Sequence, residues 1–372
     1  MTIIRNMARI MATFVFASTT SLVQAVDFGT FGDIRYQTTS VAGETNAFAL
    51  GSFDLYASQE IGPKTKALVE TVFEDRGNGF AVDLERLWIS REISSKFNIA
   101  AGRFHIPLGY WNRHYHHGIL LQETISRPAF LDFEDGEHAI MPMHIIGLMA
   151  SGALPLSGSS LSYELYVGNG SSINTSAGYN PTPDNKPEID VNNVSDPSDQ
   201  KSFGFHLTLK SNATPIQGGL FGMHNAVSES APSGGVTSFG AALTNQIILG
   251  ADFRFIKGNF DYLAAYYNIR NENKVIAPGV TQNKNTGRAY YVQFGYRITE
   301  PFKLVYRFET LRIDKDDTYF KLLGTSEYKN HVVTLRYDLD ESNALMFEAV
   351  RTEPAGGDSY TTFMLDWAFL MF

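Results

Sequence analysis

The sequence predicts an all-β fold: a transmembrane antiparallel β-barrel of about 16 strands, formed by residues 26–372. Three observations predict it. Segments of alternating polarity recur along the chain, short and long connections follow each other in strict order, and no stretch has the composition of a membrane helix. A period of two gives a strand one apolar and one polar face, as a barrel wall between lipid and water requires.

The composition narrows the class of protein. The chain has 30 Lys+Arg against 39 Asp+Glu, a net charge of −9, 13% aromatic residues, 32 Gly and no Cys. An acidic chain lacks the basic face that nucleic-acid binding needs, so we expect no nucleic-acid partner. The lack of Cys excludes disulfides, thiolate nucleophiles and Cys-ligated zinc. The apolar content of 44% excludes wholesale disorder.

The N-terminus predicts a secretory signal peptide over residues 1–25, with a buried first helix as the alternative. Arg5 and Arg9 supply positive charge, Ile10–Ala17 forms a short apolar core, and Val23–Ala25 offers small residues for cleavage. Cleavage near Ala25 would remove two positive charges and leave 347 residues with a net charge of −11. An exported chain without Cys fits the Gram-negative envelope, and we expect it in the cell outer membrane.

Membrane crossing by a helix is not expected, because such a helix needs about 20 mostly apolar residues in a row. The nearest candidate, residues 140–156, is interrupted by Pro142, His144, Gly147, Gly152 and Pro155. An exported chain without a membrane helix is either a soluble β-protein or an outer-membrane barrel.

The strands are predicted from alternation. Residues 246–255 are the clearest case, with Ile247, Leu249 and Phe253 on one face and Asp252 and Arg254 on the other. Similar patterns predict sixteen strands, at 28–38, 47–60, 65–74, 82–92, 97–104, 144–153, 160–169, 202–211, 217–224, 246–255, 259–269, 289–298, 302–312, 329–339, 344–352 and 359–372.

The connections between these segments alternate in length. The short ones include 61–64, 94–96, 154–159, 299–301 and 340–342, and the long ones are 39–46, 75–81, 105–143, 170–201, 225–245, 270–288, 313–328 and 353–358. Outer-membrane barrels have short turns on the periplasmic side and long loops outside. A soluble β-sandwich has no reason to sort its connections in this way, so the alternation favours the barrel.

Two features of the chain resemble known outer-membrane proteins. The third and longest connection, 105–143, follows the string Ala101–Phe104 (AGRF) and continues with Ile106–Asn112 (IPLGYWN), and the chain ends on Phe372 after an amphipathic strand. Strand count, loop order and this string resemble the sixteen-stranded trimeric porins, and the string is similar to that of phosphate-selective-type and related porins. The resemblance implies a third external loop folded into the pore, a homotrimer, contact with outer-membrane lipid and lipopolysaccharide, and assembly by the barrel assembly machinery.

Charged residues in the expected lumen form two groups. The constriction loop 105–143 carries five acidic residues, Glu123, Asp132, Glu134, Asp135 and Glu137. The expected polar strand faces carry seven basic residues, Arg35, Arg86, Arg254, Arg297, Lys303, Arg307 and Arg336. Such groups would place a transverse field across the pore. The alternative is that they form ion pairs that brace the loop. Because the loop is acidic, we do not expect phosphate selectivity.

Histidine is concentrated near the constriction loop, with six of the nine residues in or beside it. We expect five residues to anchor the loop to the barrel: Arg103, His105, His114, His116 and His117. Metal binding by the string His114–His117, or a pH-sensitive pore, is the alternative. The acidic loop 170–201 lacks the EF-hand spacing for calcium and is expected to be solvated. We therefore expect no metal site and no cofactor.

The function predicted from these observations is a passive diffusion channel for small hydrophilic solutes or ions. The chain has no Gly-x-Ser-x-Gly elbow, no His-Glu-x-x-His and no phosphate-binding loop, and we expect no enzymatic activity. Two alternatives belong to other classes: a binding or adhesion barrel that acts through its external loops, and an outer-membrane hydrolase with its site in loop 105–143.

Overall fold

The computed structural model describes residues 26–371, with the exception of 42, 45, 76–79, 116–117, 135, 137, 175–186, 191–198, 232–241 and 275–281. The predicted signal peptide and Phe372 therefore lie outside the described residues. Within the described ranges, no helix is both long enough and apolar enough to cross a membrane.

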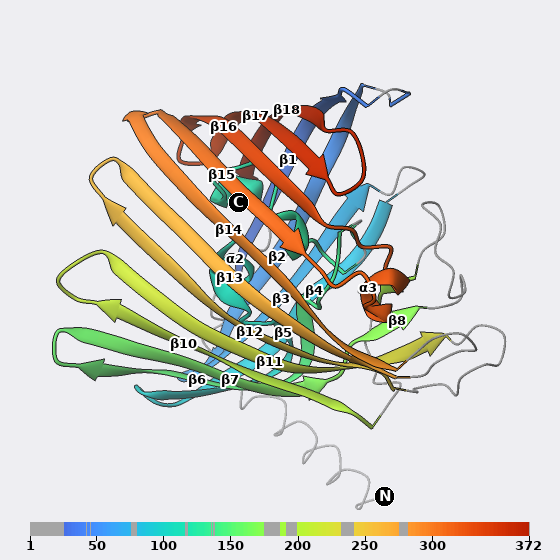
Figure 1. The fold of residues 1–372 in the computed structure, drawn as a ribbon. Coiled ribbons are helices and arrows are strands. Elements are labelled where there is room, and N and C mark those ends of the chain that lie inside the picture. The colour runs from blue at the N-terminus through green and yellow to red at the C-terminus, as the bar shows by residue number, and fades with distance from the viewer. Residues whose placement is uncertain are drawn as a thin grey trace, which may run out of the picture.

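Sixteen long strands form a closed antiparallel barrel (Figure 1). They are β1 Asp27–Thr39, β2 Ala47–Gly62, β3 Thr65–Asp75, β4 Phe80–Ser94, β5 Phe97–His105, β6 His144–Leu156, β7 Ser159–Asn169, β10 Lys201–Ser211, β11 Ile216–Ala231, β12 Ala242–Lys257, β13 Phe260–Asn273, β14 Asn283–Thr299, β15 Phe302–Arg312, β16 Tyr328–Asp340, β17 Asn343–Pro354 and β18 Tyr360–Met371. The barrel closes where β1 pairs with β18, from Thr30 opposite Met371 to Thr39 opposite Thr362. Closure leaves no open sheet edge, and the predicted fold class is confirmed.

The remaining elements are short and lie in the connections. The strands β8 Ser172–Asn174 and β9 Glu188–Ile189 lie between β7 and β10, and β8 pairs in parallel with β11. The helix α2 Gly109–His114 and the 3₁₀ turns Ile119–Leu121 and Ala129–Leu131 lie between β5 and β6. The helix α3 Thr318–Leu322 lies between β15 and β16 and begins after Asp317, whose side chain accepts a hydrogen bond from the Tyr319 N–H.

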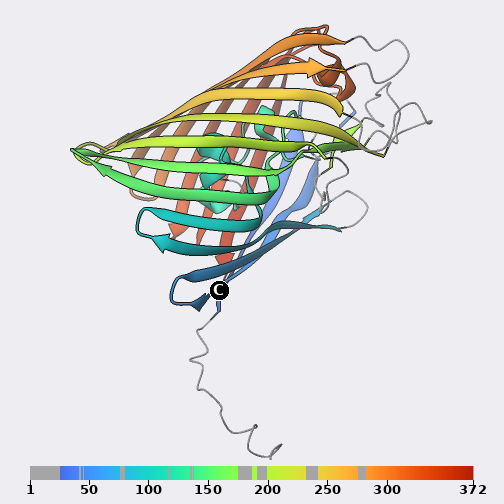
Figure 2. The ribbon, with the colours of Figure 1, turned by 90° about the horizontal axis from the view of Figure 1, so that it is seen from below.

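The predicted alternation of the connections is confirmed. Figure 2 shows tight turns at one end of the barrel and longer connections at the other. The third long connection, residues 106–143, does not extend away from the barrel: its helix α2 lies inside the ring of strands. This places the longest predicted loop within the lumen.

The two faces of the wall are those that the alternation predicts. Leu249 and Phe294 point outward with 46% and 52% of their surface exposed, while Asp252 and Gln293 face inward and are buried. Large apolar side chains are exposed on the outer surface of strands around the whole barrel, including Phe28, Val69, Leu148, Phe203, Leu249, Phe294, Leu335 and Trp367. A continuous apolar exterior on a closed barrel suits a lipid environment.

Several strands extend further than predicted. The strand β11 continues to Ala231 beyond the predicted 217–224, and β14 begins at Asn283, six residues before the predicted 289–298. The β14 extension is polar on both faces from Asn283 to Thr286, whereas in β11 residues Asn225 to Glu229 are buried on both faces, next to the pairing with β8. Neither stretch has one apolar and one polar face, so alternation disappears there although the backbone pairing continues.

Candidate functional site

The internal loop, residues 106–143, begins and ends at paired positions, because His105 and His144 lie opposite each other in β5 and β6. The first turn of the loop lies close to β13, on another part of the barrel wall. Gly109 has a φ of +82°, and a Cβ there would lie 2.3 Å from the Tyr267 hydroxyl oxygen. Only glycine combines this backbone conformation with so close an approach. The loop is therefore built to lie against β13.

Apolar side chains attach the internal loop to β13 and β14, and a second buried cluster joins its Leu120 and Ile125 to β16–β18. Trp111, Phe130 and Ile140 of the loop are fully buried in one cluster with Tyr267 of β13 and Tyr291 of β14. The Trp111 and Tyr291 rings meet edge to face with centroids 5.6 Å apart, and those of Phe130 and Tyr267 do so at 5.2 Å. Such aromatic pairs add to the free energy of burial. The expectation of a polar inner wall is wrong here, because the wall is apolar where the loop covers it.

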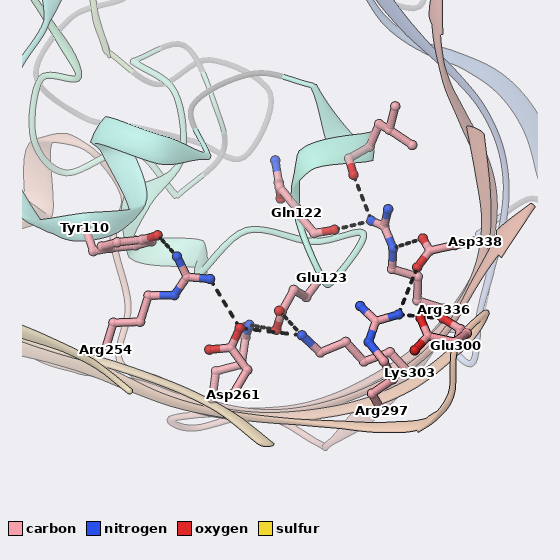
Figure 3. Close-up of polar contacts among 12 residues, drawn as sticks. Tyr110, Gln122, Glu123, Arg254, Asp261, Arg297, Glu300, Lys303, Arg336 and Asp338 are labelled. Carbon is pink, nitrogen blue, oxygen red and sulfur yellow. Dashed lines mark hydrogen bonds and ion pairs between the residues drawn. The ribbon is translucent and has the colours of Figure 1, made fainter. Parts of the chain in front are cut away.

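A row of basic wall residues reaches the internal loop (Figure 3). Arg254 of β12 donates to the Tyr110 hydroxyl and to Asp261 Oδ2, the latter at 3.2 Å. Lys303 of β15 pairs with Glu123. Burial raises the pKa of Glu123, and the charge of Lys303 opposes that rise. These cations are neutralised by loop and wall acceptors.

The row continues on β14 and β16. Arg336 donates to the backbone carbonyls of Leu120, at 2.8 Å, and Gln122, and pairs with Asp338 at 2.6 Å. Arg297 donates to the Glu300 carbonyl at 2.5 Å and lies 3.7 Å from Asp338. Arg297 thus contacts the turn at the end of the barrel rather than the loop.

Arg307 of β15 is the most deeply buried of the predicted wall cations, with 0% of its surface exposed. Its guanidinium donates to Thr124 Oγ1 at 2.7 Å, to the Ser126 carbonyl at 2.9 Å and to the Arg127 carbonyl at 3.2 Å. It also pairs with Glu309 at 2.8 Å. One side chain thus binds three residues of the loop, Thr124, Ser126 and Arg127.

Two wall carboxylates accept hydrogen bonds from backbone N–H groups of the internal loop. Glu348 of β17 accepts from Ile125 at 2.8 Å and Ser126 at 2.9 Å, and Glu309 accepts from Ala129 at 3.0 Å. A loop without regular structure leaves its backbone polar groups in need of partners. The wall supplies both donors and acceptors, and this favours the bracing interpretation of the charged residues.

The remaining wall cations contact acids of the wall itself. Arg35 of β1 lies 3.0 Å from Asp366 and 3.6 Å from Asp33, and Arg86 of β4 pairs with Glu70.

The acidic residues predicted to line the constriction do not all face open space in the pore. Glu134 is 2% exposed and accepts from the Met143 and His144 backbone N–H groups at 2.7 and 2.8 Å. Burial raises its pKa, but the charges of His144 and Arg103 outweigh burial and hold the pKa below its ordinary value. Asp132 accepts from the backbone N–H groups of Phe133 and His138. Asp135 and Glu137 lie outside the described residues.

The predicted anchors lie in different surroundings. Arg103 is buried on β5, and His105 Nε2 lies 3.8 Å from Glu70 Oε2. The His114 ring stacks on the Tyr110 ring with centroids 3.9 Å apart, and its Nδ1 lies 3.0 Å from the Tyr110 backbone carbonyl. His114 therefore contacts its own loop rather than the wall. Desolvation inside the barrel lowers the pKa of His114 to about 4, and the ring is neutral at pH 7. His116 and His117 lie outside the described residues.

A lumen cavity of about 650 Å³ lies beside the internal loop. It lies between loop residues 118–138 and strands that include β1, β2 and β15 to β17. Its charged lining residues are Arg35, Glu74, Arg127, Asp132 and Glu309. The Arg127 guanidinium stacks on Phe133 at 3.7 Å and has no hydrogen-bond partner within the described part of the chain. Burial lowers its pKa to about 10, so it stays cationic at pH 7.

Several residues that hold the loop were not predicted from the sequence. Glu348 and Asp261 were not singled out, and neither were Gln246 and Tyr267, which donate to the Ile140 and Leu108 carbonyls at 3.3 and 3.1 Å. The alternation indicates that these side chains face inward. It holds no signal for which of them an irregular loop will contact.

Comparison with known proteins identifies the fold. No protein-family model matches the chain, and no curated protein does. Solved structures match in overall fold. The anion-selective porin from Comamonas acidovorans has a TM-score of 0.59 at 12% identity, covering 94% of this chain and 100% of the porin. The outer membrane channel DcaP of Acinetobacter baumannii has a TM-score of 0.60 at 11% identity, covering 95% and 99%.

A third match is OmpF of Salmonella typhi, with a TM-score of 0.54 at 10% identity over 94% of this chain and 98% of OmpF. The chain has the porin fold. The porin resemblance noted in the sequence is thereby confirmed at the level of the fold, over nearly the whole length of both chains.

Proposed function

We propose that the protein is a passive diffusion channel of the Gram-negative outer membrane for small hydrophilic solutes. One observation carries this proposal: the internal loop packs against β13–β14 and β16–β18 inside a closed barrel, and a lumen cavity of about 650 Å³ remains between the loop and strands that include β1 and β2. A loop held inside the lumen by buried contacts narrows the path without filling it. The similarity to proteins named as porins and as a channel favours this function over an outer-membrane hydrolase.

The proposed path carries charges of both signs. Arg35 and Arg127 face the lumen cavity together with Glu74, Asp132 and Glu309. Most of the basic wall residues are neutralised by contacts with the loop or with wall acids. The transverse field expected from the sequence is therefore replaced by a mixed lining. We propose broad passage of polar solutes with modest ion preference, since only nearby uncompensated charge selects strongly.

Single-channel recording tests the proposal. The protein, purified from outer membranes in detergent, is added to a planar bilayer, and conductance steps are recorded in KCl. The same preparation is reconstituted in liposomes, and swelling is measured with neutral sugars of increasing size. We expect stable conductance steps and uptake that falls with solute size. Heat-unfolded protein is the control. A folded, heat-modifiable barrel that gives neither steps nor swelling would overturn the proposal.

We propose a homotrimer in contact with lipid and lipopolysaccharide, inserted by the barrel assembly machinery. The apolar outer surface of the barrel supports the lipid contact, and one similar structure is described as the trimer form of a Vibrio cholerae outer membrane protein. Native mass spectrometry of the detergent-extracted protein measures the subunit number. A monomer that persists in mild detergent and in membranes would contradict the trimer.

A further inference from the structure

Three residues gather at the base of the internal loop. His105 is the last residue of β5, His144 is the first residue of β6, and the two pair in the strand register. The β4–β5 register, with Leu87 opposite Arg103, places Glu85 beside His105 when it is continued by two residues. The three side chains thus form a row across three adjacent strands, where both ends of the loop meet the wall.

The row brings together side chains that bind metal ions. One ligand atom from each of Glu85, His105 and His144 lies within 4.8 Å of the other two, the one such group in the described part of the chain. His144 Nε2 lies 2.5 Å from Glu85 Oε2, and these side chains are 1% and 3% exposed. Two imidazoles and one carboxylate are a ligand set that suits zinc and related divalent ions.

The surroundings of His144 orient its ring as a metal ligand requires. Its second nitrogen, Nδ1, lies 3.1 Å from both carboxylate oxygens of Glu134. Glu134 is itself held by two backbone N–H groups. A metal-binding histidine usually donates its other N–H to a carboxylate in this way, which fixes the tautomer and leaves the first nitrogen for the ion.

The charges around the row are balanced. Three carboxylates, Glu70, Glu85 and Glu134, lie near three guanidiniums, those of Arg86, Arg103 and Arg127. The case for a bound cation therefore rests on the ligand geometry and not on net charge.

We propose that Glu85, His105 and His144 bind one divalent transition-metal ion of the zinc class. Zinc lies about 2.0–2.2 Å from nitrogen and oxygen ligands, so neighbouring ligand atoms of a tetrahedral site are about 3.4 Å apart. The three atoms already lie within 4.8 Å of one another, and the ion replaces the proton that His144 Nε2 now shares with Glu85. The bound ion joins both ends of the internal loop to β4, and water completes the coordination. This site differs from the string His114–His117 considered in the sequence.

Zinc counting on the folded protein tests the site. The chain is stripped with EDTA, checked for heat-modifiable folding, dialysed against Zn²⁺ at pH 7.5, and analysed for metal per chain. We expect one Zn²⁺ per wild-type chain and at least tenfold weaker binding in His105→Gln. Glu134→Gln, which removes only the orienting carboxylate charge, should weaken binding about 10- to 100-fold. Cobalt substitution should give the visible absorption of a low-coordinate site, lost in His105→Gln.

The matched control is His206→Gln. His206 is also fully buried against a carboxylate, with Nε2 2.9 Å from Asp252, but it does not belong to the three-ligand group. Its variant should keep the zinc. A second control, His116→Gln with His117→Gln, reports adventitious binding by the histidine-rich string. Zinc retained in His105→Gln, zinc lost only in the string variant, or no stoichiometric zinc in wild type would each overturn the site. None of these results depends on conductance, so they leave the proposed channel function to its own test.

Discussion

At the scale of single residues, Arg307 links the internal loop to the barrel wall through a buried ion pair with Glu309. Arg307→Met would remove the donor to the loop and leave the buried carboxylate uncompensated. We expect a loss of about 3–5 kcal/mol in the free energy of unfolding, measured by denaturant titration of the barrel refolded in lipid vesicles. Arg351→Met is the control, because its side chain is 53% exposed and surface changes cost within about 0.5 kcal/mol. Equal losses in the two variants would contradict the role of Arg307.

Arg127 carries a second residue-scale prediction, because its buried guanidinium lies beside the lumen cavity without a hydrogen-bond partner among the described residues. A unit charge about 8 Å from a permeating ion contributes about 0.5 kcal/mol even in bulk water. Arg127→Gln should therefore lower the anion-to-cation permeability ratio by about twofold or more, read from the reversal potential in a KCl gradient. Arg127→Lys should keep the ratio. The effect should shrink in 1 M salt, where the Debye length is about 3 Å; a shift that persists there would point to another cause.

The sequence could identify inward-facing charges but not their partners. Arg254, Lys303 and Arg336 were predicted to face the lumen from alternation alone, and they do. Alternation is a property of each strand by itself. The contacts that neutralise these cations come from an irregular loop whose path depends on packing with distant strands, such as that of Trp111 against Tyr291. No local pattern in residues 106–143 encodes that path.

At the scale of elements, the internal loop is expected to narrow the channel without holding the barrel together. Replacing residues 115–135 with a short Gly-Ser linker would remove four buried aliphatic or phenyl side chains, those of Leu120, Ile125, Phe130 and Leu131. Burial of each such side chain is worth about 1.5–3 kcal/mol, so stability should fall by roughly 6–12 kcal/mol. The strand pairing remains, and the barrel should still form while single-channel conductance rises.

The point variant Phe130→Ala distinguishes the contribution of the loop to barrel stability from its effect on conductance. It should cost about 3–5 kcal/mol while conductance rises far less than in the linker variant, because most of the loop stays in place. An unchanged conductance in the linker variant would show that the loop does not limit the path.

Strand prediction succeeded where each face meets a different medium. The segment 246–255 was predicted within β12, which spans Ala242–Lys257, because Leu249 meets the apolar exterior while Asp252 faces inward. It failed at the end of β11, where Asn225 to Glu229 are buried on both faces, and at the start of β14, where both faces are polar. The internal helix α2 was also not predicted as a helix, since six residues are too few to show a helical period.

At the scale of the whole molecule, stability comes from a closed ring of backbone pairs with two different solvents on its two sides. The outer surface is apolar along the middle of the strands, where lipid can cover it, and the inner surface is apolar where the internal loop packs on it. Acidic and basic residues are therefore confined to the lumen, the connections and the strand ends. This placement of the charged residues explains how a chain with 19% charged residues has a continuous apolar outer surface.

The last prediction tests whether the apolar outer surface of the barrel meets lipid. Leu249→Arg and Phe294→Arg place a charge on the outer face, where both native side chains are exposed. We expect each to cost about 2–4 kcal/mol if the position lies near the bilayer midplane, and less toward the interfaces. The free energy of unfolding is measured for barrels refolded in lipid vesicles. Leu249→Met is the matched control and should be nearly neutral, because it keeps an apolar side chain in an apolar solvent. An arginine that costs nothing at both positions would mean that this face does not meet lipid, and the membrane placement of the barrel would then be wrong.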